Sequence, residues 1–393
     1  MRTKITFYSA TLLALCVLLM AMPAIAIATT YPLAITDSAG RELTITMEPV
    51  KIIVLNSDAA EAVKVLGHVH NIVGVVADIK NKKSYYFPGL KNTPSVGTWK
   101  EFDYGKIAEL ATDDHTLVIT YTSKLEPVEK LKGFRNITVV AFDFYKHDTL
   151  QEEVTKLGTI LNATGAVDKY RGWYQTKEES VKKAVAGLEP VSRNKLANAI
   201  LSYLEATRLG EPVKHIELNR LSRLAWFYSY GQKPWVFIEG TVTGLEDIAT
   251  KGPGSADDFA CTMAGGKNVA GELSKTYPHL GWEWVVAQNP DVIIKGVYTS
   301  GWGWSSIDEP ERLRADIKSR PAAESIFAVK DNRIYAFCNE PLYGLDSVVG
   351  LTYWVKIIHP ELNLNPKEVY TEYLNKFMGI SYPEGKIFVY PGV

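Results

Sequence analysis

The stretch Val50–Gly67, VKIIVLNSDAAEAVKVLG, joins an apolar run to a segment with helical spacing. The run at 52–55, IIVL, has no polar position, which is typical of a strand buried on both faces of a sheet. Asn56, Ser57 and Asp58 are residue types that cap helix N-termini. The small and apolar residues at 59–66 then repeat at helical spacing up to the final glycine. The stretch predicts a strand, a turn and a helix, which together open a parallel βαβ unit.

The same alternation extends to both sides of this stretch. Residues 31–49 have the pattern of a small β-hairpin with a turn at 37–40. Further strands are predicted at 72–76, 117–120 and 137–141, with a short helix at 106–110. A second pattern has strands at 235–238, 292–294 and 333–337, and helices at 255–264, 346–358 and 366–377. We therefore predict an α/β fold with two Rossmann-like lobes, whose parallel sheets turn their strand ends towards a shared cleft.

The segment between the two patterns is compatible with a long helix. From 166 to 188 the helix-compatible sequence is interrupted only by isolated glycines. At 1.5 Å per residue, a helix over this range would be about 35 Å long. It predicts a stiff connection between lobes, although two ordinary helices within one domain would fit the same residues. The expected division is an N-terminal lobe at 31–165, a connecting helix at 166–190, a helical insertion at 191–232 and a C-terminal lobe at 233–393.

The first residues have the pattern of an export signal. Arg2 and Lys4 precede an uncharged apolar stretch at 10–22, and small residues at 24–28 fit a cleavage site. The apolar stretch could also span a bilayer and be retained. We therefore interpret 1–28 as a signal peptide or an N-terminal anchor, and we expect an exported protein at the cell surface or in a periplasm-equivalent space.

Composition and motifs argue against several function classes. The formal net charge is −1, which does not favour a nucleic-acid binder. The seven histidines are scattered, without partners at metal-ligand spacing, and no G-x-S-x-G, P-loop or H-E-x-x-H motif occurs. We expect no catalytic residues, no metal site and no cofactor. Cys261 and Cys338 could form one disulfide or remain as two buried thiols.

Several motifs in order resemble one family. Beside Val50–Gly67, they are VGTW at 96–99, AGGKNV at 264–269, QNPDVII at 288–294 and AVKDNRIY at 328–335. Together they resemble the helical-backbone (class III) solute-binding proteins of ABC importers, over residues 31–380. That class carries ferric siderophores, haem and cobalamin. The resemblance implies capture of an iron chelate, haem or corrinoid between the lobes and delivery to a permease and ATPase complex.

Candidate ligand-binding residues are aromatic or acidic side chains in loops that should reach the cleft, because ring faces and a few polar groups hold large rigid ligands. Trp99 matches the family's cleft-lining tryptophan. The other candidates are Tyr85 and Tyr86 after the second strand, Glu239, Tyr298, Trp302 and Trp304 in a glycine-rich loop, and Glu340 and Tyr343.

Transporter docking is the other property that the resemblance implies. Members of the family offer one exposed carboxylate per lobe to the permease, and Glu283 matches the position in the second lobe. In the first lobe Gly105 stands where a glutamate is usual, so Asp103 or Glu101 is the candidate substitute. This departure and the insertion at 191–232, a surface hairpin or a partner-contacting or membrane-facing element, keep open the alternative of a surface sensor or adhesion module on the same fold. A divalent-metal-binding importer component of related shape is a further alternative, against which the scattered histidines argue.

Overall fold

The structure is a computed structural model that describes residues 28–112, 114–188, 233–299 and 302–393. The expected insertion at 191–232 and all but the last residue of the expected leader lie outside these ranges. Within them, no helix combines the length and the apolar character needed to cross a membrane.

The N-terminal lobe contains a four-stranded parallel sheet in the order β4-β3-β5-β6. Its strands are β3 (Lys51–Val54), β4 (Ile72–Val75), β5 (Thr116–Thr120) and β6 (Ile137–Ala141). The helices of this lobe are α2 (Ser57–Val65), α3 (Ala77–Lys82), α4 (Tyr104–Ala111), α5 (Glu126–Leu131) and α6 (Leu150–Ile160). The predicted hairpin is present as β1 (Leu33–Thr36) and β2 (Glu42–Ile45).

The predicted opening motif forms as expected. β3 is the inner strand that pairs with both β4 and β5, and its residues 52–54 are fully buried. The Asn56 side chain then accepts a hydrogen bond of 2.8 Å from the amide of Ala59, which caps α2. A strand whose residues 52–54 are all apolar therefore takes an inner position in the sheet, and the capped helix turns back from its carboxyl end.

The C-terminal lobe contains a seven-stranded mixed sheet. Its order is β10-β8-β7-β11-β12-β13, with β9 paired to β7. The strands are β7 (Trp235–Gly244), β8 (Asp247–Thr250), β9 (Lys267–Asn268), β10 (His279–Leu280), β11 (Val292–Val297), β12 (Ile334–Cys338) and β13 (Val389–Tyr390). The central β7, β11 and β12 are parallel, whereas β8, β10 and β13 are antiparallel additions. The helices are α10 (Ala256–Met263), α11 (Trp282–Gln288), α12 (Asp308–Ser319), α13 (Phe327–Lys330), α14 (Ser347–Ile358) and α15 (Pro366–Tyr373).

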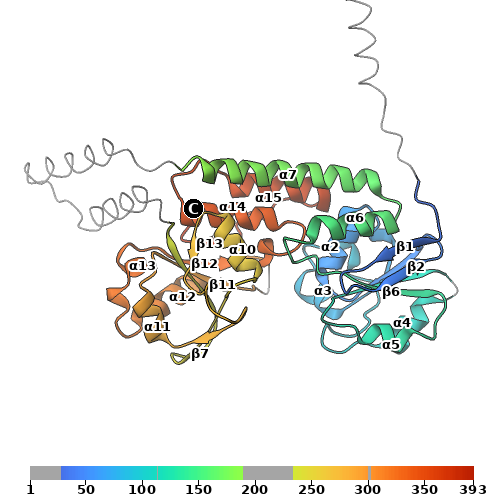
Figure 1. The fold of residues 1–393 in the computed structure, drawn as a ribbon, viewed down its shortest axis with the longest axis horizontal. Coiled ribbons are helices and arrows are strands. Elements are labelled where there is room, and N and C mark those ends of the chain that lie inside the picture. The colour runs from blue at the N-terminus through green and yellow to red at the C-terminus, as the bar shows by residue number, and fades with distance from the viewer. Residues whose placement is uncertain (1–27, 113, 189–232, 300–301) are drawn as a thin grey trace, which may run out of the picture.

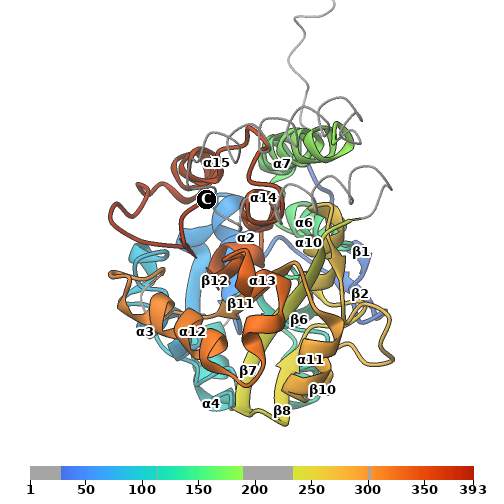
Figure 2. The ribbon, with the colours of Figure 1, turned by 90° about the vertical axis from the view of Figure 1, so that its left-hand side faces the viewer.

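A single helix, α7 (Thr164–Ala186), runs along both lobes (Figure 1). It packs against α6 of the first lobe and α14 of the second. Figure 2, turned by 90°, places α7, α14 and α15 together at one end of the molecule, with both sheets beyond them. The chain after α15 also returns to the first lobe, since the π-helical turn Leu374–Met378 contacts α2. The lobes are therefore joined by a layer of helices and not by one strut alone.

Candidate ligand-binding cleft

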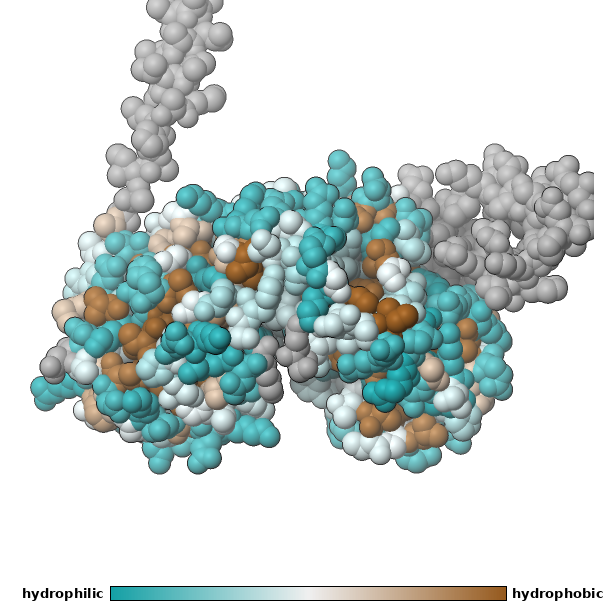
Figure 3. Space-filling view, turned by 180° about the vertical axis from the view of Figure 1, so that it is seen from behind, coloured by the Kyte–Doolittle hydropathy of each residue, from teal (hydrophilic) through white to brown (hydrophobic). Residues whose placement is uncertain are grey.

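A cavity of about 400 Å³ lies between the two lobes, and both lobes line it. Its walls are loops and helix starts at the carboxyl ends of the parallel strands, where α/β folds bind ligands. Figure 3 shows the notch between the lobes from behind. The first lobe contributes Ser57, Asp58, Lys83, Trp99, Tyr121, Ser123, Lys124 and Tyr145, and the second contributes Lys251, Ala256, Asp257, Tyr277, Tyr298, Glu340 and Tyr343.

Trp99 stands at the cleft on a tight turn. The amide of Thr98 donates to the carbonyl of Glu101 at 2.8 Å, and the amide of Glu101 donates back to Thr98. Gly97 begins this turn with φ +97°, and a Cβ there would lie 2.4 Å from the Glu101 carbonyl, so only glycine fits. The turn leaves Trp99 47% exposed, with the ammonium of Lys124 over its ring at 5.4 Å. The turn therefore places a partly exposed indole in the lining of the cavity.

Each lobe places one phenol–carboxylate pair in the cleft. Tyr121 follows β5 and donates to Asp58 at 2.6 Å, and Tyr343 donates to Asp257 at 2.7 Å. Both carboxylates lie in the first turn of a helix, α2 or α10, where the helix dipole stabilises negative charge. Burial, and next the charge of the paired aspartate, hold the pKa of both tyrosines well above the ordinary value. Each hydroxyl therefore stays a donor and fixes its carboxylate as an acceptor.

The ionic side chains of the cleft are balanced. Three lysines (Lys83, Lys124, Lys251) and three acidic residues (Asp58, Asp257, Glu340) line it. The Lys83 ammonium donates to the hydroxyl of Ser57 at 2.9 Å, and the Lys251 ammonium lies 5.2 Å above the ring of Tyr277. Donors and acceptors of both signs thus alternate with aromatic faces around one space.

Glu340 lies under the cleft and holds the loop that carries Tyr298. One of its oxygens accepts from the amide of Thr299 at 2.7 Å and from the Thr299 hydroxyl at 2.9 Å, and the other accepts from the Cys338 thiol at 2.6 Å. Tyr298 itself is 67% exposed and stacks on Tyr343 with ring centroids 5.9 Å apart. Glu340 therefore positions the wall that Tyr298 and Tyr343 form.

Four of the predicted aromatic residues lie away from this cavity. Tyr86 and Trp302 are buried and stack on each other at 4.0 Å, and the indole of Trp302 donates to the hydroxyl of Tyr370. Trp304 is buried where the chain bridges to Ile387. Tyr85 is partly exposed, but its hydroxyl donates to the carbonyl of Ser381. Tyr85 and Tyr86 thus connect the first lobe to the C-terminal lobe, whereas Trp304 packs within the C-terminal lobe, and we leave all four rings out of the proposed site.

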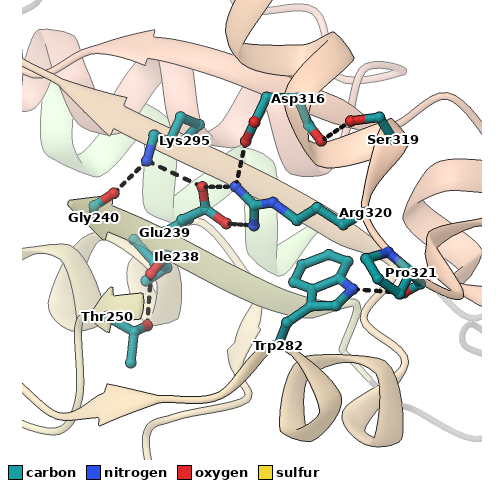
Figure 4. A network of polar contacts seen from close by, with 10 residues as sticks. All are labelled: Ile238, Glu239, Gly240, Thr250, Trp282, Lys295, Asp316, Ser319, Arg320 and Pro321. Atoms are coloured by element: carbon teal, nitrogen blue, oxygen red, sulfur yellow. Dashed lines mark hydrogen bonds and ion pairs between the residues drawn. The ribbon is translucent and has the colours of Figure 1, made fainter. Parts of the chain in front are cut away.

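Glu239 also lies outside the cleft. It is fully buried in β7 and forms a two-pronged ion pair with Arg320, at 2.6 and 3.0 Å. Lys295 of β11 lies 3.0 Å from one of its oxygens. Figure 4 shows Arg320 and Lys295 both reaching the Glu239 carboxylate, and the Arg320 guanidinium also reaching Asp316. Because Glu239 is fully buried as well, its carboxylate is not accessible to a ligand in the cleft. Its role is therefore internal to the C-terminal lobe.

Sequence reasoning missed a second group of cleft residues: Asp58, Lys83, Tyr121, Lys124, Tyr145, Lys251, Asp257 and Tyr277. Tyr121 directly follows β5, so the rule that ligands bind at strand ends would have found it. Asp58 was visible only as a helix-start residue, and nothing local distinguishes a capping carboxylate from one that lines a cleft.

The candidate docking residues lie far from α7. α4 and α11 are both at the lower edge of Figure 1, opposite that helix. Glu283 is exposed in the first turn of α11, and Glu101 is exposed just before α4. Asp103 is exposed too, but it caps α4 by accepting from the amide of Lys106 at 2.9 Å.

The described part of the chain contains no group of three or more His, Cys, Asp or Glu side chains that could hold a metal ion. Cys261 and Cys338 are both free and buried.

Comparison with known proteins identifies the fold. No family model matches the chain. A "Cobalamin-binding protein" of Halobacterium salinarum, found in two strains, is 23% identical over 272 residues, which cover 69% of this chain and 60% of that protein. The chain therefore spans less than two thirds of the length of these curated relatives.

Solved structures are similar over nearly the whole chain. The TroA-like periplasmic binding protein FepB from Veillonella parvula gives a TM-score of 0.65 at 16% identity, and the match covers 91% of this chain and 99% of that one. The periplasmic molybdate-binding protein MolA from Haemophilus influenzae gives 0.61 at 16% identity, covering 89% and 99%. These matches confirm the predicted two-lobed α/β fold and the resemblance at the level of the fold. These relatives are binding proteins.

Proposed function

We propose that this chain, whose fold is that of the class III solute-binding proteins, is the exported binding component of an ABC importer and carries a corrinoid. Iron chelates and haem are the other cargoes that the family resemblance implies. The cobalamin-binding relative supports the corrinoid, and so does the chemistry of the cleft. We assign it a binding role and not a catalytic one.

The balanced cleft is the observation that carries this proposal. A highly anionic chelate in this cleft would be attracted by the three lysines but repelled by the three carboxylates that line the same space. The cleft is therefore not built for a highly anionic ligand. A ligand edged with neutral amides offers donors to Asp58 and Asp257 and acceptors to the lysines at the same time. A corrinoid has such an edge around a large rigid ring, which the faces of Trp99 and Tyr298 can cover.

The helix layer predicts a small closing motion. α7 packs on both lobes, and the C-terminal segment contacts α2, so a wide opening would break buried contacts at several places. We propose that capture involves a few degrees of hinge or shear, with the carboxylates near α4 and α11 presented to the permease on the far side from α7.

Purified protein tests the cargo directly. Protein isolated from its native host is expected to show the visible absorption of a corrinoid, and tryptophan fluorescence is expected to be quenched by cyanocobalamin but far less by haemin or a ferric siderophore. Trp99→Ala and Tyr298→Ala should each weaken binding about tenfold, since a buried ring contributes on the order of 1–2 kcal/mol.

The matched control is Phe134→Ala, because Phe134 is 43% exposed like Trp99 but does not line the cleft. If the protein instead preferred haem or a siderophore, that ligand and not a corrinoid would be its cargo. Binding of none of the three would count against an importer function and favour the sensor or adhesion alternative.

A further inference from the structure

The sequence contains two triplets of the form Asn-x-Thr, at 136–138 and 162–164, and this form is the acceptor pattern for N-linked glycans in exported proteins. Neither triplet lines the cleft between the lobes. A glycan is attached to the side-chain nitrogen of the asparagine, so accessibility and hydrogen bonding of that nitrogen decide whether the folded protein can carry the sugar. The two triplets differ sharply in both respects.

Asn162 is exposed on the turn between α6 and α7. The turn is a Schellman motif, closed by a hydrogen bond of 2.7 Å from the amide of Ala163 to the carbonyl of Gly158. Asn162 occupies its left-handed position, with φ +53°, a conformation that asparagine adopts more readily than most residues. The Asn162 Oδ1 accepts from the amide of Thr29 at 2.9 Å, whereas Nδ2 has no hydrogen-bond partner among the described residues. The structural role of Asn162 therefore uses its backbone and its oxygen and leaves the nitrogen accessible.

The surroundings of this turn suit a bulky attachment. The turn lies at the end of α7 that covers the first lobe, on the side of the molecule opposite α4 and α11 (Figure 1). A glycan there would leave the cleft open and the exposed carboxylates near α4 and α11 uncovered. Thr29, which the Asn162 side chain contacts, directly follows the expected leader at 1–28. The contact thus keeps the turn beside the part of the chain that is nearest the membrane during export.

Asn136 has the same triplet in a different environment. It is half-buried, and its Nδ2 donates to the carbonyls of Thr112 and Asp114, the latter at 3.4 Å. These bonds hold the chain between α4 and β5 against the start of β6. The threonine of this triplet, Thr138, lies within β6 and pairs in register with Leu117 of β5. A glycan on Asn136 would displace both carbonyls, so the native fold is incompatible with it.

We propose that Asn162 carries an N-linked glycan in the exported protein and that Asn136 stays unmodified. In the transfer, the Asn162 Nδ2 forms a bond to the anomeric carbon of a sugar whose donor is a lipid-phosphate-linked glycan of the membrane. The bond from that carbon to the phosphate oxygen breaks, the lipid phosphate leaves with the bonding electrons, and one amide proton is released to a base of the membrane transferase. The inference requires export, but it does not require a corrinoid cargo.

Peptide mass spectrometry of the full chain purified from its native host tests the proposal. The peptide that contains Asn162 should carry the added mass of a glycan, and the peptide that contains Asn136 should have its unmodified mass. Thr164→Ala, expressed in the same host, should lose the added mass, because it destroys the triplet and leaves Asn162 in place. Thr164 is not the N-cap residue of α7, which is Ala163, so this variant keeps the helix start intact. Thr164→Ser should retain the glycan.

Asn136→Gln is the matched control, and it should leave the added mass on the Asn162 peptide unchanged. An unmodified Asn162 peptide would overturn the proposal, and so would an added mass that persists in Thr164→Ala or a glycan on Asn136. Titration of the same preparation with cyanocobalamin keeps the two proposals separate. A glycosylated protein that does not bind cyanocobalamin would lose its proposed cargo and keep this modification site, whereas an unmodified protein that binds it would do the reverse.

Discussion

Glu61 of α2 accepts a hydrogen bond from the hydroxyl of Tyr373 at the end of α15, so a buried carboxyl in the first lobe is fixed by the C-terminal segment. The Tyr86 hydroxyl lies 2.6 Å from the same oxygen and 3.2 Å from Asp346, which precedes α14. The single Tyr86 proton cannot serve both carboxyl groups fully, which favours the protonated form of one of them. The joint between the lobes therefore contains two acidic groups that burial disfavours in their charged form.

The stability of this joint should depend on pH. Burial raises the pKa of Glu61 to about 7 from its ordinary 4.5, and burial also raises that of Asp346, while Lys83 acts in the opposite direction on both. The folded state then binds more protons than the unfolded state between about pH 4.5 and 7, so stability should fall as pH rises through this window. Thermal unfolding at pH 5, 6, 7 and 8 should show the melting temperature decline by a few degrees.

Glu61→Gln removes the titrating group and should flatten this decline, whereas Glu129→Gln, at a side chain 76% exposed, should leave it as in the wild type. A slope that persists in Glu61→Gln would show that the pH dependence arises elsewhere.

His147 should produce the opposite slope in acid. Its burial lowers the pKa to about 4 from 6.5, so the unfolded state binds more protons between these values. The stabilising effect is complete above about pH 6.5 and is lost as pH falls towards 4. Compared with the wild type at the same pH, His147→Gln should gain melting temperature as pH falls from 6.5 to 4.5, and the exposed His70→Gln serves as control. An unchanged acid slope in His147→Gln would contradict the assignment.

Much of the fold could be predicted because its signals are local. The strand predicted from the apolar run at 52–55 is present as Lys51–Val54, and the helix predicted over 59–66 is present as Ser57–Val65, so the bounds agree within two residues. The short edge strands β10 and β13, of two residues each, have no periodicity to read, and they exist because distant strands offer partners. The expected helix at 366–377 instead ends at Tyr373 and continues as a π-helical turn.

The candidate site was less predictable because it depends on which way side chains face. The tryptophans at 302 and 304 sit in a glycine-rich loop that suggested exposure, yet both are about 3% exposed. Their neighbours come from far along the chain, Tyr86 for one and Ile387 for the other. Trp99 was predicted from its match to the family's cleft-lining tryptophan, and the structure has this ring at the cleft, on a turn that begins at Gly97.

The phenol–carboxylate pairs should be needed for binding but not for folding. Tyr121→Phe removes the hydroxyl that orients Asp58, and Tyr343→Phe does the same for Asp257. Hydrogen bonds to charged groups contribute about 1.5–3 kcal/mol, so each variant should raise the Kd for cyanocobalamin about tenfold or more. Tyr390→Phe, outside the cleft, is the control, and equal losses in all three variants would remove the special role of the pairs.

Docking can be strengthened or weakened at the surface without touching the cleft. If the proposed importer function holds, Glu283→Lys should lower cargo-stimulated ATP hydrolysis by the reconstituted importer, because a cation would repel the basic permease residues that the family resemblance implies. Gly105→Glu should raise it, and the position tolerates a side chain since its Cβ would meet only a carboxylate oxygen of Asp103, at 3.4 Å. Cargo affinity should be unchanged in both. If ATP hydrolysis responds to neither substitution, these faces are not the docking surface.

A variant at the buried ion pair of Glu239 and Arg320 can distinguish a structural role of Glu239 from a ligand-binding role. Glu239→Ala leaves Arg320 and Lys295 without their shared carboxylate, and loss of one partner of a buried pair costs about 3–5 kcal/mol. Chemical denaturation should show a loss of that size, while the variant that remains folded should bind cargo with the wild-type Kd. Glu272→Ala breaks an ion pair to Lys267 at a side chain 84% exposed and should cost little. The opposite outcome would be a Kd for the cargo raised about tenfold with an unchanged free energy of unfolding. Glu239 would then belong to the binding site, because direct contact with the ligand can change the Kd without changing the stability of the fold.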